Sequence, residues 1–220
     1  HHGAKQGARM SAVNWAMLAI LSILWGGSFL FVELALVGLP TVSIVWLRVA
    51  GAAAVLALWM RVSGVAFPQG RGVWGALAVM GLLNSAVPFT LFVLAQGQIT
   101  GGLAAILNAT TPLWTVIVAH GFTADEKISR GKALGLALGF GGVLVIAGGG
   151  SGEAAAVLAC LGAALSYGFA GVWGRRFKGL GLQPLQVAFG MVASSSMILL
   201  PVWLVVDRPW GQAMPAPGVV

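Results

Sequence analysis

The stretch WAMLAILSILWGGSFLFVELALV, residues 15–37, decides the fold class. It contains one charged side chain, Glu33, and it is long enough to cross the hydrocarbon core of a bilayer, which takes about 20 apolar residues. It is too long for the apolar region of a cleavable signal peptide, which has about 7–15 residues. We therefore predict a transmembrane helix at residues 15–37.

Six further stretches of similar length and composition follow along the chain. Glycine- and proline-containing turns separate them, and 59% of the 220 residues are hydrophobic while 8% are charged. A soluble domain has about 25% charged residues, so these charges are too few to cover a water-exposed surface. We predict an all-α polytopic membrane protein whose other six helices span residues 42–60, 73–94, 103–122, 131–149, 154–173 and 185–206.

The positive charges predict the orientation of these helices, because cytoplasmic loops of membrane proteins are enriched in Lys and Arg. Arg48 lies within a predicted helix and Arg208 lies on one side of the membrane, whereas the other ten of the twelve basic residues all lie on the opposite side. We therefore expect a cytoplasmic N-terminus and a bacterial-type inner membrane. This distribution also explains the net charge of +7 and the pI of about 10.9 without a nucleic-acid partner.

The first two and the last two predicted helices resemble each other. Trp25 in LSILWGGS matches Tyr167 in AALSYG, and Pro40 matches Pro184. The second copy starts five helices after the first, and an odd offset inverts the second copy in the membrane, as in many transporters. We expect residues 1–13 to be a tag remnant or cytoplasmic tail and residues 14–149 a first five-helix repeat. Residues 150–220 would then be helices 6 and 7 and the start of helix 8 of a C-terminally incomplete second repeat. Chance similarity between two apolar hairpins is the alternative.

Five segments occur in an informative order: LWGGSF at 24–29, WLR at 46–48, NSAVPF at 84–89, AAILNATTPL at 104–113, and DEKIS at 125–129 with a glycine-rich continuation at 135–142. Together they resemble the EamA-type families of the drug/metabolite transporter superfamily, over about residues 14–206. The resemblance implies ten helices in two inverted five-helix repeats around a central cavity. It also implies alternating-access transport of small metabolites such as amino acids.

Two charged residues within helices are the first candidates for a solute site or gate. A charge near the bilayer centre is costly and usually faces the protein interior or water. Glu33 lies roughly 6 Å and Arg48 roughly 9 Å from the ends of neighbouring antiparallel helices, at 1.5 Å per residue. These depths are compatible with an ion pair in one transport state. An outer gate, or a pair exchanged for substrate or a proton, is one interpretation, and a fixed structural pair is the other.

Polar residues and prolines near the middle of helices 3 and 4 form the second set of candidates. Proline removes a backbone donor, and such breaks persist in membranes where neighbouring groups or cavity water satisfy the freed carbonyls. We predict a solute-binding cavity lined by this set; interhelical hydrogen bonding combined with kinks is the alternative. The set comprises Asn84, Asn108 and Thr111, with helix breaks at Pro88 and Pro112.

Trp25, Ser28 and Tyr167 are the remaining site candidates. Trp25 and Tyr167 occupy matching repeat positions near mid-helix, whereas aromatic residues in membrane proteins usually gather at the interface. A cavity wall and ordinary packing both explain this position.

The leading functional prediction is a secondary transporter with a small-molecule substrate, embedded in the lipid bilayer. A non-transporting membrane subunit or sensor is the first alternative, and an intramembrane lipid-modifying enzyme is the second. The sequence has no metal cluster and no nucleophile–base pair, so we predict no catalytic residue, no metal and no cofactor. A stripe of small residues in helix 5 favours close packing within the repeat or, alternatively, a homodimer face: Gly131, Gly135 and Gly139.

Overall fold

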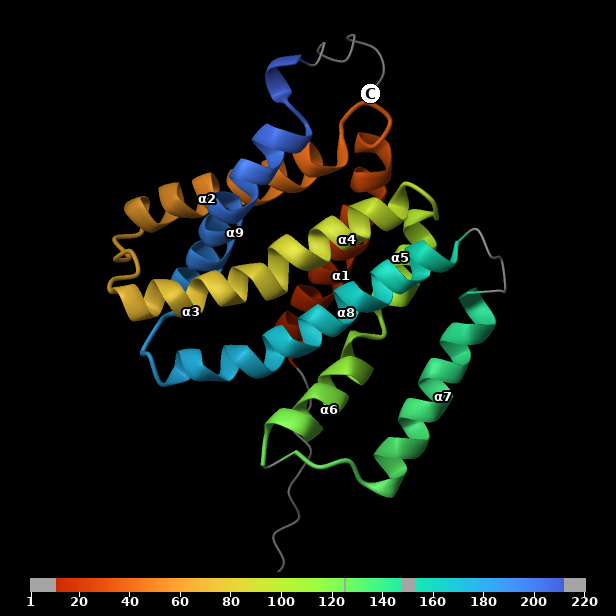
Figure 1. Ribbon diagram of the computed structural model, residues 1–220. Helices are drawn as coiled ribbons and strands as arrows, with labels where there is room; N and C mark the ends of the chain where they lie inside the picture. The colour runs from red at the N-terminus through yellow and green to blue at the C-terminus, as the bar shows by residue number, and fades with distance from the viewer. Residues whose placement is uncertain (1–10, 125, 148–152, 212–220) are drawn as a thin grey trace, which may run out of the picture.

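The computed structural model describes residues 11–124, 126–147 and 153–211, and within these ranges every regular element is a helix. Figure 1 shows the helices arranged as one bundle, with α7 at its edge. The elements are α1 (Ala12–Ala35), α2 (Thr41–Val62), α3 (Arg71–Gly81), η1 (Leu82–Ala86), α4 (Val87–Gln96), α5 (Gly101–Asn108), α6 (Thr111–Phe122), α7 (Arg130–Ala147), α8 (Ala154–Gly174), η2 (Arg175–Lys178), α9 (Pro184–Val206) and η3 (Pro209–Gly211).

Six of the helical segments in the described residues are long and apolar enough to cross a membrane. They are α1, α2, the run from α3 to α4, the run from α5 to α6, α8 with η2, and α9. The one predicted span not among these six, residues 131–149, corresponds to α7, an apolar helix of 18 residues. Its predicted end at Gly148 and Gly149 lies outside the described residues, as do residues 1–10 of the predicted tail at 1–13, the turn at 148–152 and the start of helix 8.

Large apolar side chains cover much of the outer surface of the bundle. On α1, Ile23 is 73% exposed and Phe31 is 71% exposed, and on α7 Val145 is 82% exposed. Contiguous apolar surface on this scale is unfavourable in water, whereas lipid tails solvate it. These exposures agree with an integral membrane protein.

Side-chain caps explain where several helices begin. The Ser11 hydroxyl accepts a hydrogen bond from the Asn14 amide at 3.2 Å at the start of α1, and the Thr100 hydroxyl accepts one from the Leu103 amide at 3.3 Å at the start of α5. Each hydroxyl satisfies one of the amides that a helix N-terminus leaves unpaired. α9 begins at Pro184, which suits the first helical position because its missing N–H would have no partner there.

Contacts between helix ends agree with the predicted alternation of the helices across the membrane. Arg175, after α8, forms a salt bridge with Glu126, in the connection between α6 and α7. At the other ends of the helices, the backbone amide and the hydroxyl of Ser43 in α2 both donate hydrogen bonds to Asp207, directly after α9. Each contact joins segments that the sequence places on the same side.

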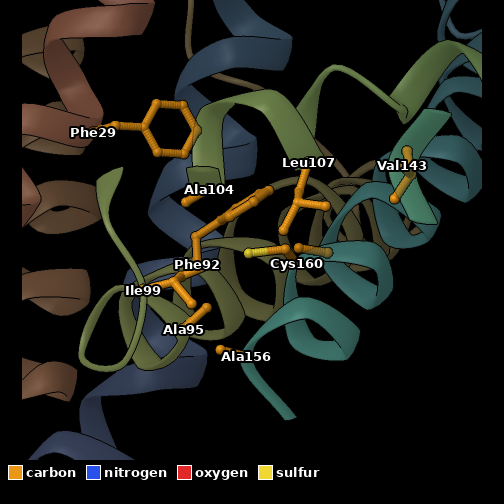
Figure 2. Packing of buried hydrophobic residues seen from close by; sticks show 10 residues of the cluster. Phe29, Phe92, Ala95, Ile99, Ala104, Leu107, Val143, Ala156 and Cys160 are labelled. Atoms are coloured by element: carbon orange, nitrogen blue, oxygen red, sulfur yellow. The ribbon is translucent and has the colours of Figure 1, made fainter. Parts of the chain in front are cut away.

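The main apolar core lies where α4, α5 and α8 meet. Phe92 contributes from α4, Leu107 from α5 and Cys160 from α8, and all three are buried. Figure 2 shows these side chains pointing toward one another, with Phe29 of α1 on the other side of Phe92. Four alanines in the same cluster let the helix backbones approach closely, as small residues do in membrane bundles. A second core joins α1, α2, α4 and α9.

α2 and α9 make the most extensive helix–helix contact within the described residues. The rings of Trp46 and Trp203 stack at 4.0 Å between centroids, with their planes 6° apart. Trp46 Nε1 donates to the Ser196 carbonyl at 3.2 Å, and Trp203 Nε1 donates to the Ser43 hydroxyl at 2.9 Å. Both indole N–H groups thus find partners across the interface, which fixes α2 against α9.

Candidate functional site

Two of the cavities between the described helices share Trp25 and Tyr167 as lining residues. The first, which we name the Arg48 cavity, has a volume of about 180 Å³ and is lined by α1, α2, α4 and α8. Its walls are Leu21, Leu24, Trp25, Ser28, Phe29, Val32, Arg48, Phe89, Phe92, Gln96 and Tyr167. The second, the Asn108 cavity, has a volume of about 390 Å³ and is lined by Trp25, Met80, Asn84, Asn108, Thr111, Thr115, Tyr167 and Gly171.

Arg48 carries the positive charge of the first cavity. Its Nη2 donates a hydrogen bond to the Ser28 hydroxyl at 2.8 Å, and its guanidinium carbon lies 4.6 Å from the centroid of the Phe89 ring. Both of these partners are neutral, so neither cancels the charge. A guanidinium presents five N–H donors in a planar fork, and therefore most of its donor capacity is available to the cavity.

Aromatic rings form the wall between the two cavities. The Trp25 and Tyr167 rings lie 6.5 Å apart between centroids with planes inclined at 58°. Tyr167 also stacks on Phe92 at 6.3 Å, and Phe92 meets Phe29 edge-on at 5.5 Å. Trp25 and Tyr167, which occupy matching positions of α1 and α8, therefore face each other. They pack together and they also line the cavities, which combines the two interpretations given for them above.

The predicted third helix is not continuous, because a π-helical turn, η1, separates α3 from α4. In the π register the carbonyl of Leu83 would accept a hydrogen bond from the amide five residues later. That residue is Pro88, which has no N–H. The Ser166 hydroxyl of α8 instead donates to the Leu83 carbonyl at 2.6 Å, and the Ser195 hydroxyl of α9 donates to the Gly81 carbonyl at 2.9 Å. Two other helices therefore satisfy the backbone of this break.

Asn84 lies within this π turn and lines the Asn108 cavity. Its Nδ2 lies 3.1 Å from the sulfur of Met191 in α9, a weak acceptor. The Asn84 amide thus combines a contact with α9 and a position on the cavity wall.

The predicted fourth helix is divided into α5 and α6 around residues 109 and 110. Pro112 cannot donate to the carbonyl of Asn108 four residues earlier. The Thr111 hydroxyl supplies that hydrogen bond instead, at 2.7 Å, and also lies 3.4 Å from Asn108 Oδ1. The break therefore holds Asn108 and Thr111 together on the cavity wall, and Thr115, one turn later, lines the same cavity.

The ion pair predicted between Glu33 and Arg48 is not formed in this structure. Glu33 Oε2 accepts a hydrogen bond from the Gly101 amide at 3.0 Å, at the N-terminus of α5, where a carboxylate is favourable. A side chain on Gly101 would place its Cβ 2.7 Å from that oxygen and 3.2 Å from the Phe29 carbonyl oxygen, so it would displace the Glu33 carboxylate. Glu33 faces α5 while Arg48 faces α1 and α4, because the two side chains leave their helices in different directions.

Several cavity residues were not among the predicted candidates. Phe89, Phe92 and Gln96 lie on one face of α4, at spacings of three and four residues that bring side chains together. Gln96 is buried, and its Nε2 donates to the Phe29 carbonyl at 2.8 Å, which joins α4 to α1. A buried glutamine in an apolar helix is a signal that would have identified this face. The two phenylalanines carry no such signal, since phenylalanine is equally suited to lipid.

The glycine stripe of α7 is divided between two environments. A Cβ at Gly139 would lie 2.7 Å from Leu113 of α6, whereas a Cβ at Gly131 or Gly135 would have no atom within 4 Å. Gly139 thus packs against α6 within the repeat. The neighbouring residue Phe140 meets Trp114 edge-on, with 5.0 Å between the ring centroids. A homodimer at Gly131 and Gly135 stays a prediction.

Comparison with known proteins gives one match. The model of the EamA-like transporter family matches residues 13–148, which is more than half of the 220 residues. Neither the curated proteins nor the solved structures include a match to the chain. The chain therefore belongs to the EamA-like transporter family, part of the drug/metabolite transporter superfamily.

Proposed function

We propose that this protein is a secondary-active transporter that moves small metabolites such as amino acids across the membrane by alternating access. The observation that carries the proposal is the Arg48 cavity, in which a cation inside a membrane-spanning helix has neutral partners and faces open space. Ionisable residues within transmembrane segments mark solute or ion pathways. Membership of a transporter family supports the same interpretation.

The proposal places the N-terminus and the basic loops in the cytoplasm, in a bacterial-type inner membrane. It also treats residues 14–149 as the first repeat and residues 150–220 as part of an inverted second repeat. The pairing of Trp25 with Tyr167 across the cavities is consistent with this symmetry. In such a protein, one repeat moves against the other around a binding site near the bilayer midplane.

Transport is tested by reconstituting the protein in liposomes and measuring uptake of a panel of radiolabelled amino acids and carboxylates, with and without a pH gradient. We expect saturable uptake that Arg48→Gln lowers about tenfold or more, because it removes a charge-assisted contact worth about 1.5–3 kcal/mol. Arg61→Gln, at the other end of α2, is the matched control and should leave uptake unchanged. If no solute is taken up above protein-free liposomes, transport by this chain is excluded for that panel.

Orientation is tested separately by cysteine labelling in intact cells. Cys160 is the single cysteine and is buried, so a Cys160→Ala background carries no competing thiol. In that background we expect a membrane-impermeant maleimide to label Val37→Cys and to leave Ser63→Cys unlabelled until the cells are opened. The reverse pattern would invert the proposed topology.

A further inference from the structure

We infer that the solute of the Arg48 cavity is a monoanionic carboxylate with an apolar body about the size of one ring. The inference rests on the proposed function and narrows small metabolites to carboxylates without an ammonium group, which excludes the amino acids named there as an example. Arg48 recognises the carboxylate, the rings line the space for the body, and none of the described acidic side chains lines the cavity to pair with an ammonium group. Charge, shape and the position of the acidic residues each support one part of it.

The charge of the cavity requires an anion. Arg48 is partly buried within α2, and its hydrogen bond to Ser28 and its contact with the Phe89 ring leave its charge uncompensated. An unpaired cation in a membrane-spanning segment is costly. A carboxylate binds a guanidinium through two parallel N–H···O bonds, so an anionic solute would both neutralise this charge and use its free donors.

The walls of the cavity favour an apolar body of limited size. Phe92, Phe29 and Tyr167 form a connected set of rings, with centroids 5.5 and 6.3 Å apart, and Trp25 closes the set beside Tyr167. A dry apolar cavity of about 150 Å³ holds one benzene molecule, and the Arg48 cavity has about 180 Å³. A second hollow of about 470 Å³ shares Leu24, Ser28, Val32 and Arg48 as lining residues, which leaves room for a short chain between ring and carboxylate.

The acidic residues lie elsewhere. None of the described acidic side chains lines the Arg48 cavity. Glu33 binds the Gly101 amide and lines a separate hollow with Gly102 and Ala105. Asp207 binds Ser43 at the end of α9. A solute that carries an ammonium group would therefore lose hydration of that group without gaining a counter-charge.

The test is equilibrium binding to the purified protein in lipid nanodiscs at pH 7.5, with four ligands that share one scaffold. They are 3-phenylpropionate (anion), 3-phenylpropionamide (neutral and nearly isosteric), phenylalanine (which adds an ammonium group) and 3-phenylpropylamine (cation). We expect 3-phenylpropionate to bind more tightly than phenylalanine, and at least tenfold more tightly than the amide and the amine. Equal or tighter binding of phenylalanine would overturn the inference, and so would amide or amine binding within tenfold of the carboxylate.

Variants then assign the recognition to Arg48. Arg48→Gln should weaken binding of 3-phenylpropionate about ten- to hundredfold and leave binding of the amide unchanged, whereas Arg48→Lys should recover part of the loss. Arg61→Gln is the control. An equal loss for anion and amide would assign Arg48 a structural role only and would overturn the inference.

Binding and transport fail separately in this design. Saturable uptake of neutral or cationic solutes by a protein that does not prefer the carboxylate would refute the inference and keep the proposed function. Selective carboxylate binding without any flux would refute the proposed function and keep the site.

Discussion

α1 and α8 carry matching sequences, yet they lie in different surroundings. In the 18-residue apolar stretch of α8 with η2, 39% of the residues are buried. In the corresponding stretch of α1, 6% are buried. α8 packs extensively against α4 and α6, whereas the contacts of α1, chiefly with α5 and α4, are smaller. The same apolar motif can therefore be buried among helices, as in α8, or exposed at the surface of the bundle, as in α1. The motif alone does not predict which of these two environments it occupies.

This difference has a direct consequence for the proposed inverted repeat. α4 and α6 cover α8, so an inverted copy of these helices would cover α1 in the same way. The predictions below compare residues of the two helices, from the largest expected effect to the smallest.

The largest effect is expected at two glycines that follow the facing aromatic residues. A Cβ at Gly168 of α8 would lie 3.1 Å from the backbone of Trp114, whereas a Cβ at Gly26 of α1 would meet nothing within 4 Å. Gly168→Leu should lower the free energy of unfolding by about 3 kcal/mol or more, because helix backbone cannot yield as a side chain can. Gly26→Leu should change it by less than about 1 kcal/mol. Reversible unfolding in mixed micelles measures both.

Equal destabilisation by the two leucines would contradict the comparison. It would mean that α1 is covered as closely as α8 in the protein studied in solution. The glycine pair thus also reports on whether further protein packs on α1.

A smaller effect is expected for two serines. Ser166 of α8 donates to the Leu83 carbonyl at the π turn, whereas Ser22 of α1 donates to the Leu18 carbonyl of its own helix at 2.8 Å. Ser166→Ala should cost about 0.6–1.7 kcal/mol, the range for interhelical hydrogen bonds in membranes. Ser22→Ala should be close to neutral, because the Leu18 carbonyl retains its helical partner. A neutral Ser166→Ala, measured in the same unfolding assay, would show that the π turn does not depend on α8.

The smallest effect is expected at Glu33, a charged residue within α1, whereas α8 contains no charged residue. Glu33→Gln should lower the free energy of unfolding by about 0.3–1 kcal/mol, because a carboxylate near a helix N-terminus is favourable by that amount. Glu153→Gln removes an exposed carboxylate from the N-cap of α8, where it makes no capping hydrogen bond, and should cost no more than Glu33→Gln. A loss several times larger would indicate that Glu33 has a partner other than Gly101.

The sequence predicted the spans well and their internal geometry less well. Residues 42–60 and 185–206 fall within α2 and α9, because long apolar runs bounded by Gly, Pro and charged residues determine helix length directly. The prolines indicated breaks at Pro88 and Pro112, but a π turn and a split helix depend on which neighbouring hydroxyls replace the lost donors. Those neighbours come from α8 and α9, far away in the sequence.

The candidate site shows the same division. Trp25, Ser28, Arg48 and Tyr167 could be selected because polar and large aromatic residues in the middle of a span require a reason to be there. The direction of Glu33 could not be predicted, since an almost uniformly apolar helix contains no polar face from which its rotation can be inferred. Phe89 and Phe92 were missed for the same reason.

The π turn between α3 and α4 also has a consequence for biogenesis. A ribosome adds about 5–20 residues per second, so roughly 4–16 s separate the synthesis of Pro88 from that of Ser166. During this interval the Leu83 carbonyl is in the membrane without the hydroxyl that later satisfies it. We therefore expect the middle of helix 3 to complete its hydrogen bonding only when helices 6 and 7, which carry Ser166 and Ser195, have been inserted.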